Sequence, residues 1–281
     1  MSTTYFITGA NRGIGFAIVN SLAENLNNKV IATVRDKSKA VDLLKLAEQN
    51  SNIHIIEVDV GDSKSIDTLD DQIQPFTSQI DIFISNAAMG TIISKVLEIP
   101  EHEWLNHYKV NTLGPILVLQ KLYKYLIKSD IKKIAIISSL AGSFQAPIKT
   151  SFNPYGQTKC ALNFAVYNLA SELQPEGFIV LAIHPGAVLT ETALKTFDIF
   201  DARNPQIGGA LRSIAITPEE SATSVLKIVN KATDEINVLG AISWLGVGVT
   251  LGIHGTFVAE IITEITTYLD IYALSIKHKK A

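Results

Sequence analysis

The stretch TGANRGIG, residues 8–15, follows a short apolar run and opens a longer amphipathic one. A strand, a glycine-rich turn and a helix in this order bind phosphate groups, because the first N–H groups of the helix have no partner within it. Gly9 allows a tight turn, Gly13 lets a phosphate approach the backbone, and Gly15 lets the helix pack closely on the strand. We name residues 8–15 the glycine turn and predict that it binds a pyrophosphate; an ordinary turn between two elements is the alternative.

Short apolar runs alternate with amphipathic runs along most of the chain. Buried parallel strands have continuous apolar sequences, and the helices that connect them cover both faces of the sheet. The alternation predicts a doubly wound α/β fold of Rossmann type, a single domain with a mostly parallel sheet of six to seven strands. The expected strands are 3–8, 29–34, 52–58, 80–85, 132–138 and 178–183. The expected helices are 13–27, 38–50, 101–128 with a break near Pro115, 155–173, and two that start at Asp62 and Thr217.

Composition narrows the classes of protein that this chain can belong to. It has 281 residues and a net charge of −3, so no basic surplus points to a nucleic-acid partner. The single cysteine, Cys160, excludes an internal disulfide and fits a reducing compartment. The apolar run near the N-terminus is too short for a secretory leader. We therefore expect a cytoplasmic protein whose partner is a small molecule.

The glycine spacing differs from GxGxxG and from the P-loop, which ends in Gly-Lys-Ser/Thr. It resembles the TGxxxGxG motif of the short-chain dehydrogenase/reductase family, and further motifs of that family follow in order over residues 3–232. ITGANRGIG and VNTLGP resemble the carbonyl-reductase-like and C-factor-like members, with fungal ketoreductases as near relatives. The resemblance implies a set of cofactor-binding residues: Gly9, Asn11, Arg12, Gly13, Ile14, Gly15, Arg35, Asp59, Val60, Asn86, Ala87, Lys121, Tyr155, Lys159, Pro185, Gly186, Val188 and Thr190.

The residues after the second expected strand indicate which cofactor is bound. Enzymes that use NAD carry an acidic residue there, which bonds the ribose hydroxyls. Here Val34 stands at that position, Arg35 follows it, and Arg12 lies within the glycine turn. Arginine forms bidentate hydrogen bonds with phosphate, so the pair favours NADP(H), whose ribose carries a 2′-phosphate. The alternative is that both arginines are ordinary surface charges.

Four polar residues stand where the resembled family has its catalytic groups. ISSLAG (137–142) resembles ISSxxG, whose second serine corresponds to Ser139, and Tyr155 and Lys159 form YxxxK. On spacing alone that pair could be one side of a solvated helix. The resemblance implies that Tyr155 transfers a proton, Ser139 holds the substrate oxygen, and Asn111 holds a water in a proton relay. Lys159 would bind the nicotinamide ribose and lower the pKa of Tyr155.

Together the motifs predict an NADPH-dependent oxidoreductase that reduces a ketone or aldehyde of a small molecule to an alcohol, with Tyr155 as proton donor. A non-catalytic NADP(H)-binding sensor or scaffold on the same fold is the alternative, and a methyltransferase with a similar glycine loop is a more distant one. Ser139, Tyr155 and Lys159 favour the enzyme, because a sensor needs none of them. The histidines form no cluster, so no metal is expected.

Two loops are expected to shape access to the site. The segment 190–217 contains Asn204-Pro205 and Gly208-Gly209, and we interpret it as a mobile substrate lid, with a surface loop as the alternative. The segment 143–154 is longer than the resembled family usually shows, and Phe144, Pro147 and Phe152 would hang over the crevice.

The C-terminal part departs from the resembled family. Residues 1–235 are expected to form the NADP-binding reductase domain, and 236–281 an atypical apolar segment. Residues 236–259 carry no formal charge, and this uncharged stretch is long enough for a membrane-spanning helix. A final strand followed by a loop would also be apolar. A packed tail is favoured over an anchor. A homodimer through 101–128 and 155–173 and a monomer both remain open.

Overall fold

The computed structural model describes residues 2–90, 92, 94–144, 152–203, 205–233, 240–243 and 248–250. Its strands form one sheet in the order β3-β2-β1-β4-β5-β6-β7-β8. Neighbours are parallel from β3 to β7, and β8 is antiparallel to β7. The predicted six main strands are confirmed, and β7 and β8 extend the sheet by two short ones. The strands are β1 Thr3–Ile7, β2 Asn28–Val34, β3 Ile53–Glu57, β4 Ile82–Ser85, β5 Lys133–Ile137, β6 Ile179–His184, β7 Gly240–Ser243 and β8 Gly248–Thr250.

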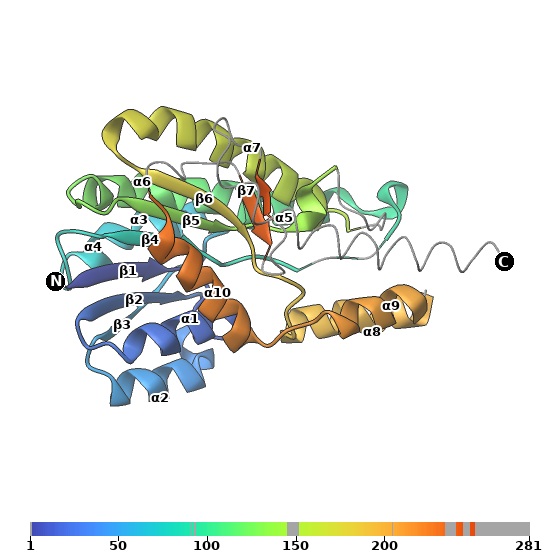
Figure 1. Cartoon of the computed structure of the whole chain (residues 1–281), viewed down its shortest axis with the longest axis horizontal. Coiled ribbons are helices and arrows are strands. Elements are labelled where there is room, and N and C mark those ends of the chain that lie inside the picture. Colours follow the sequence, from blue (N-terminus) through green and yellow to red (C-terminus); the bar gives the residue numbers. More distant parts are fainter. Residues whose placement is uncertain are drawn as a thin grey trace.

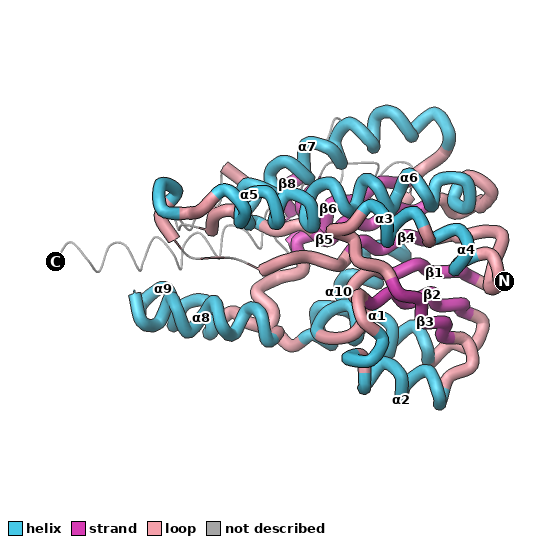
Figure 2. Tube along the Cα trace, turned by 180° about the vertical axis from the view of Figure 1, so that it is seen from behind, coloured by secondary structure: helices cyan, strands magenta, loops and turns pink. Residues whose placement is uncertain are grey.

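Helices cover both faces of this sheet, as the alternation predicts. Figure 1 shows α1, α2 and α10 on one side and α3, α4, α6 and α7 on the other, and Figure 2 shows the same layers from behind. Strand order reverses between β1 and β4, which is where a doubly wound sheet opens a ligand crevice. The helices are α1 Gly13–Ala23, α2 Val41–Gln49, α3 Ser63–Asp67, α4 Leu69–Ile73, α5 Glu101–Tyr108, α6 Gly114–Leu126, α7 Tyr155–Leu173, α8 Glu191–Arg203, α9 Pro205–Ser213 and α10 Pro218–Lys231.

Two apolar cores lie on opposite faces of the sheet. Successive side chains of a strand point to opposite faces, so Tyr5 and Ile7 join the core under α1 and α10, while Phe6 joins the core under α6 and α7. Phe6 is fully buried and meets Phe83 of β4 edge to face, with ring centroids 6.0 Å apart. Burying one such ring stabilises the fold by about 1.5–3 kcal/mol. These cores hold the carboxyl ends of the strands in register.

The long helical region 101–128 is interrupted where the sequence predicts a break. Helix α5 passes into a π-helical turn over Lys109–Leu113, and α6 follows directly. Pro115 has no N–H to give to the carbonyl of Asn111 four residues earlier, so α-helical bonding cannot continue there. The turn places Asn111 on the inner side of this region, where it is fully buried. A capping box starts α10, in which the side chains of Thr217 and Glu220 each bond the other residue's backbone N–H.

The segment predicted to be a mobile connection, 190–217, is largely helical. Helices α8 and α9 pack on each other and project beyond the sheet (Figure 1). Phe197, Phe200 and Leu211 bury one another between them. A Cβ on Gly208 would lie 1.9 Å from a carboxylate oxygen of Asp201, so this glycine permits close helix packing rather than a loop. The expectation of loop conformation is wrong because helix packing outweighs the usual effect of glycine and proline. The interpretation of 190–217 as a substrate lid stays a prediction.

The C-terminal segment is only partly described. Of residues 236–259, which the sequence marks as an anchor or a packed tail, only β7 and β8 are described; the remainder, and all of 260–281, lie outside the described residues. Among the helices of the described ranges, none has both the length and the apolar composition for crossing a membrane.

Candidate active site

The glycine turn lies at the carboxyl end of β1 and opens α1. Gly9 and Gly13 have φ of 69° and 56°, a region that side-chain-bearing residues rarely adopt. A Cβ on Gly15 would lie 2.2 Å from the carbonyl oxygen of Gly9, so only glycine lets the helix close on the turn. No side chain caps the start of α1, and its first turn has no acidic residue. The helix therefore presents its N–H groups and its positive end to an anion.

Asn86 connects the end of β4 to the glycine turn. Its side-chain amide donates to the carbonyl oxygens of Thr8 and Gly9 at 3.1 and 3.0 Å. The backbone N–H groups of Asn86 and Ala87 both donate to the hydroxyl of Thr8, at 3.0 and 3.1 Å. The Asn86 side chain thus shapes the turn from behind. Residue 9 has no room for a side chain, since a Cβ on Gly9 would come within 2.8 Å of the Ala87 Cα.

Ser139, Tyr155 and Lys159 are brought together by β5 and α7. Ser139 follows β5, and its hydroxyl accepts from the N–H of Ala141, which starts the short 3₁₀ turn Leu140–Gly142. Tyr155 begins α7, and Lys159 follows one turn later, with its Nζ 5.7 Å from the Tyr155 ring centroid. That Nζ also donates to the carbonyl oxygen of Ile137 at 2.7 Å. The other serine of the motif is turned away, since the hydroxyl of Ser138 bonds Asn163 on α7.

Glycines allow the start of α7 to lie against the turn after Ser139. A Cβ on Gly142 would lie 2.6 Å from the carbonyl carbon of Lys159, and one on Gly156 would lie 2.6 Å from the carbonyl oxygen of Ala141. Both contacts are with backbone atoms, which can move only at a large cost in packing energy. The close approach therefore sets the distance between Ser139 and Tyr155.

Burial dominates the ionisation of this group. It raises the pKa of Tyr155, and a hydrogen bond with Ser139 opposes that rise. It lowers the pKa of Lys159 to about 8, because the ammonium is withdrawn from water. The expected lowering of the Tyr155 pKa by Lys159 is not found: desolvation of the phenolate is the larger effect, and Ser139 is the group that favours the anion.

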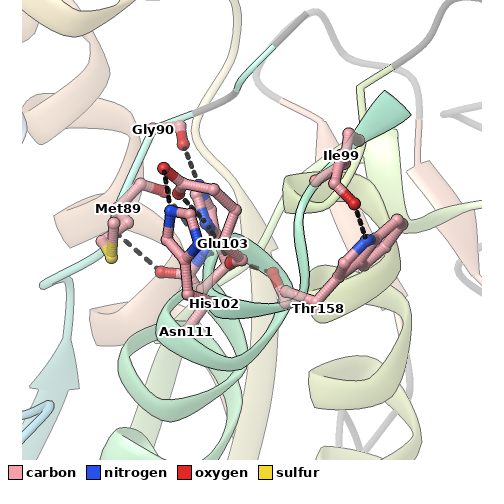
Figure 3. A network of polar contacts seen from close by, with 9 residues as sticks. Met89, Gly90, Ile99, His102, Glu103, Asn111 and Thr158 are labelled. Carbon is pink, nitrogen blue, oxygen red and sulfur yellow. Dashed lines mark hydrogen bonds and ion pairs between the residues drawn. The ribbon is translucent and has the colours of Figure 1, made fainter. Parts of the chain in front are cut away.

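Asn111 joins two parts of the site instead of reaching into open space. Its Oδ1 accepts from the N–H of Met89 at 2.7 Å, and its Nδ2 donates to the carbonyl oxygen of Met89 and to the hydroxyl of Thr158 at 3.2 and 3.1 Å. Thr158 in turn donates to the carbonyl oxygen of Tyr155 at 2.7 Å. Figure 3 shows Asn111 between Met89 and Thr158. The side chain ties the loop after β4 to the first turn of α7.

The segment after β6 reaches the glycine turn from the other side. Gly186 has a φ of 94°, and Val188 forms a bridge with Ile216, so the chain turns sharply after Pro185. A Cβ on Gly13 would lie 3.0 Å from Cγ2 of Thr190, which places Thr190 against the glycine turn. These predicted residues therefore border the same crevice.

Three other predicted cofactor residues lie in two places, Asp59 and Val60 after β3 and Lys121 on α6. Asp59 follows β3 and accepts from the N–H of Gly61 at 2.8 Å, and Val60 is buried in the core beside it. Lys121 is on the outer side of α6 and pairs with Asp67 of α3, with Nζ 2.8 Å from a carboxylate oxygen. The structure thus places Lys121 in a contact between helices and not with the other predicted site residues.

The two arginines predicted to meet a 2′-phosphate have different surroundings. Arg12 pairs with Glu191 in the first turn of α8, and both side chains are exposed. Glu191 also pairs with Lys195, and these cations lower its pKa, Lys195 more than Arg12. Arg35 is exposed after β2, and among the described residues it makes no ion pair. The pairing of Glu191 with the glycine turn was not predicted, because no local pattern marks contacts so far apart in sequence.

His184 is a second residue whose place the motifs do not reveal. It ends β6, and its Nδ1 accepts from the N–H of Leu140 at 3.4 Å, just after Ser139. Burial lowers its pKa to about 4, so it is neutral at physiological pH. This contact gives His184 a structural role beside the turn after Ser139. No cluster of His, Cys, Asp or Glu in the described residues could hold a metal ion.

A cavity of about 260 Å³ lies between the turn after Ser139 and the start of α7. Phe144 is 98% exposed at its rim, and Phe152 contacts Phe200 of α8, with ring centroids 5.4 Å apart. Pro147, which the sequence places over the crevice, lies outside the described residues. The cavity is lined by Ala141, Gly142, Ser143, Phe144, Phe152, Asn153, Gly156, Gln157 and Cys160.

A parallel sheet with a glycine turn at its switch point, and a serine, a tyrosine and a lysine gathered beside it, define a dinucleotide-dependent oxidoreductase. The family model for short chain dehydrogenases matches residues 3–198, and the chain belongs to this family, as its motifs predict. An uncharacterized oxidoreductase of Saccharomyces cerevisiae is 44% identical over 241 residues, covering 83% of this chain and 92% of that protein.

Carbonyl reductases stand among the solved structures that this chain resembles. The NADPH-bound carbonyl reductase from chicken fatty liver is 26% identical, with a TM-score of 0.74 over 86% of this chain and 92% of the other. The carbonyl reductase Sniffer of D. melanogaster is 24% identical and shares the fold, with a TM-score of 0.75 over 87% of this chain and 97% of the other. The prediction of a carbonyl-reductase-like member is confirmed.

Proposed function

We propose that this oxidoreductase uses NADPH to reduce a ketone or aldehyde of a small molecule to the corresponding alcohol. The observation that carries the proposal is the meeting of Ser139, Tyr155 and Lys159 at the carboxyl edge of the sheet, beside a glycine turn built to receive a pyrophosphate. The NADPH-bound carbonyl reductase among its structural neighbours supports the same reaction.

The protonation states fit the direction of reduction. Burial raises the pKa of Tyr155, so the phenol keeps its proton at neutral pH and can give it to a developing alkoxide. Ser139, which bonds the Tyr155 hydroxyl, would hold the same oxygen and stabilise its charge. Lys159, whose pKa burial lowers to about 8, is still mostly charged at pH 7. The bound cofactor would supply the hydride.

The residues around the glycine turn fit NADP(H). The uncapped start of α1 suits the pyrophosphate, and Thr190 lies against the turn. Arg12 and Arg35 would share the 2′-phosphate, although Arg12 must also accommodate Glu191. Lys159 would reach the nicotinamide ribose from the start of α7. Asn111 would act through its backbone carbonyl oxygen and through its hydrogen bonds to Met89, since both polar atoms of its side-chain amide already have partners.

The test is turnover by the purified full chain with NADPH and a panel of aldehydes and ketones, followed by cofactor absorbance. We expect oxidation of NADPH with at least one carbonyl, and a lower rate with NADH. Tight NADPH binding without turnover on any carbonyl would contradict the proposal and favour the non-catalytic sensor. Equal rates with NADPH and NADH would contradict the cofactor assignment alone.

A further inference from the structure

His107 lies on α5 with a carbonyl oxygen against each of its ring nitrogens. The Nδ1 atom is 2.8 Å from the carbonyl oxygen of Glu103, one helical turn earlier, and Nε2 is 2.8 Å from the carbonyl oxygen of Gly90. The side chain is 1% exposed, so water does not serve either nitrogen from bulk solvent. Figure 3 shows Gly90 and Glu103 within this network, beside Asn111.

A neutral imidazole cannot make both contacts as hydrogen bonds. It carries one N–H, and its other nitrogen presents a lone pair. In either tautomer one ring nitrogen of His107 would therefore turn a lone pair toward a carbonyl oxygen in a buried place, which folded proteins avoid. An imidazolium donates from both nitrogens and satisfies Gly90 and Glu103 together.

The charges around His107 suit the doubly protonated form. A carboxylate oxygen of Glu103 lies 3.7 Å from Nδ1, on the same helix. The other carboxylate oxygen lies 3.5 Å from His102, whose side chain is exposed. The segment after β4 contributes the neutral carbonyl of Gly90, and no other ion pair reaches His107 within the described ranges. A buried cation thus has one anionic neighbour, which is the arrangement that buried charges require.

The contact with Gly90 fixes a point that the proposed site uses. Asn111, one turn after His107, brackets the neighbouring Met89 with hydrogen bonds to its N–H and carbonyl groups. On the other side, a Cβ on Gly90 would lie 2.1 Å from Cγ2 of Thr192 in the first turn of α8. Met89 and Gly90, the 89–90 segment, are therefore held between α5 and the start of α8, with His107 and Asn111 as the two clamps.

We propose that His107 is a buried imidazolium that positions the 89–90 segment, keeping the loop after β4 seated against both Asn111 and α8. Its effect on turnover rests on the proposed function; its protonation state does not. His107 is a positioning residue in this scheme, since it contacts neither Tyr155 nor the glycine turn.

Nitrogen-detected NMR of histidine-labelled full-length protein tests the protonation state directly. The chain has six histidines, and the signal missing from His107→Gln assigns His107. We expect both ring nitrogens of His107 to show imidazolium shifts at pH 7.5. His184, which burial keeps neutral, provides the matched control in the same spectrum. A single neutral tautomer at His107 would overturn the proposal, whether or not the protein reduces carbonyls.

Variants at this position test the positioning role. His107→Phe keeps a ring but offers no donor, so we expect faster hydrogen exchange at the Met89 amide. We also expect kcat to fall by at least about tenfold, because a displaced 89–90 segment would misplace groups of the site. His107→Gln can still donate to Gly90 and should lose less. His102→Gln, on the exposed side of α5, should match the wild type. Unchanged exchange in His107→Phe, or equal losses in Phe and Gln variants, would overturn the role. Absence of turnover in the wild type would count against the proposed function only.

Discussion

At the scale of single residues, burial decides how Tyr155 and Lys159 are protonated. It raises the pKa of the phenol and lowers the pKa of the ammonium to about 8, so both groups still carry their protons at pH 7. Only the hydrogen bond from Ser139 works toward the tyrosinate. A site in this state is prepared to give up a proton, which is what reduction of a carbonyl requires.

Replacing Tyr155 with phenylalanine removes the proposed proton donor while it keeps the ring. Because positioned acid catalysis contributes about 10²–10⁴-fold, Tyr155→Phe should lower kcat by that order with little change in NADPH affinity. Tyr167→Phe is the matched control, since that side chain is half exposed on the same helix. Steady-state rates and a cofactor binding titration check both variants. Wild-type turnover by Tyr155→Phe would contradict the assignment.

Replacing Lys159 with methionine should reveal the cost of burying its charge. The folded pKa, about 8, is below the ordinary 10.5, so between these values the unfolded chain holds a proton that the folded chain has released. Unfolding free energy therefore rises with pH in this window, and the burial penalty is fully present below about pH 8. Relative to Lys159→Met, the wild type should gain up to about 3 kcal/mol between pH 7 and 10.

Urea unfolding of wild type and Lys159→Met at several pH values measures this difference. Methionine cannot donate to the Ile137 carbonyl, but that loss is the same at every pH and leaves the slope unaffected. A stability difference that stays constant from pH 7 to 10 would show that the ammonium is better solvated than its 3% exposure implies.

At the scale of elements, the site depends on how closely α7 approaches the turn after β5. A methyl group on Gly142 would fall 2.6 Å from the carbonyl carbon of Lys159 and 2.7 Å from the N of Cys160. Gly142→Ala should therefore force α7 outward, at a cost of about 1–3 kcal/mol, and lower kcat by separating Ser139 from Tyr155.

Gly209→Ala serves as the matched control for that substitution. Gly209 is exposed on α9, and a Cβ there meets nothing within 4 Å. Alanine favours a helix over glycine by up to about 1 kcal/mol, so this variant should be as stable as the wild type or more stable. Urea midpoints of the two variants decide the matter; similar midpoints would mean that α7 has room to shift.

Elements with strong periodicity were predictable from the sequence, and contacts between distant residues were not. The apolar runs of β1 to β6 and the glycine turn fixed the fold because each pattern is local. Gly208 misled the prediction for α9, since its packing against Asp201 appears only in three dimensions. The family motifs identified Ser139, Tyr155 and Lys159, but no motif indicates that His107 meets Gly90 or that burial outweighs Lys159 in setting the pKa of Tyr155.

At the scale of the whole molecule, α8 joins the projecting pair of helices, α8 and α9, to the edge of the sheet that carries the glycine turn. Thr190 lies against Gly13 and Thr192 against Gly90, so the first turn of α8 closes over two of the loops that border the crevice. Phe200 of the same helix contacts Phe152 from the loop before α7. A substrate and a cofactor would therefore both meet α8, which makes charge on this helix relevant to binding.

The pairing of Glu191 with Arg12 predicts how cofactor affinity responds to a change on α8. The carboxylate offsets part of the positive charge that a 2′-phosphate would meet at Arg12, and the pair is exposed, so the effect is modest and screened by salt. Glu191→Gln should tighten NADPH binding by about two- to fivefold at low salt and leave NADH binding unchanged. In an Arg12→Ala background the same substitution should have no effect on either cofactor. Fluorescence titrations of the four proteins with both cofactors measure this, and equal tightening for NADH would show that Glu191 acts on the pyrophosphate and not on the 2′-phosphate.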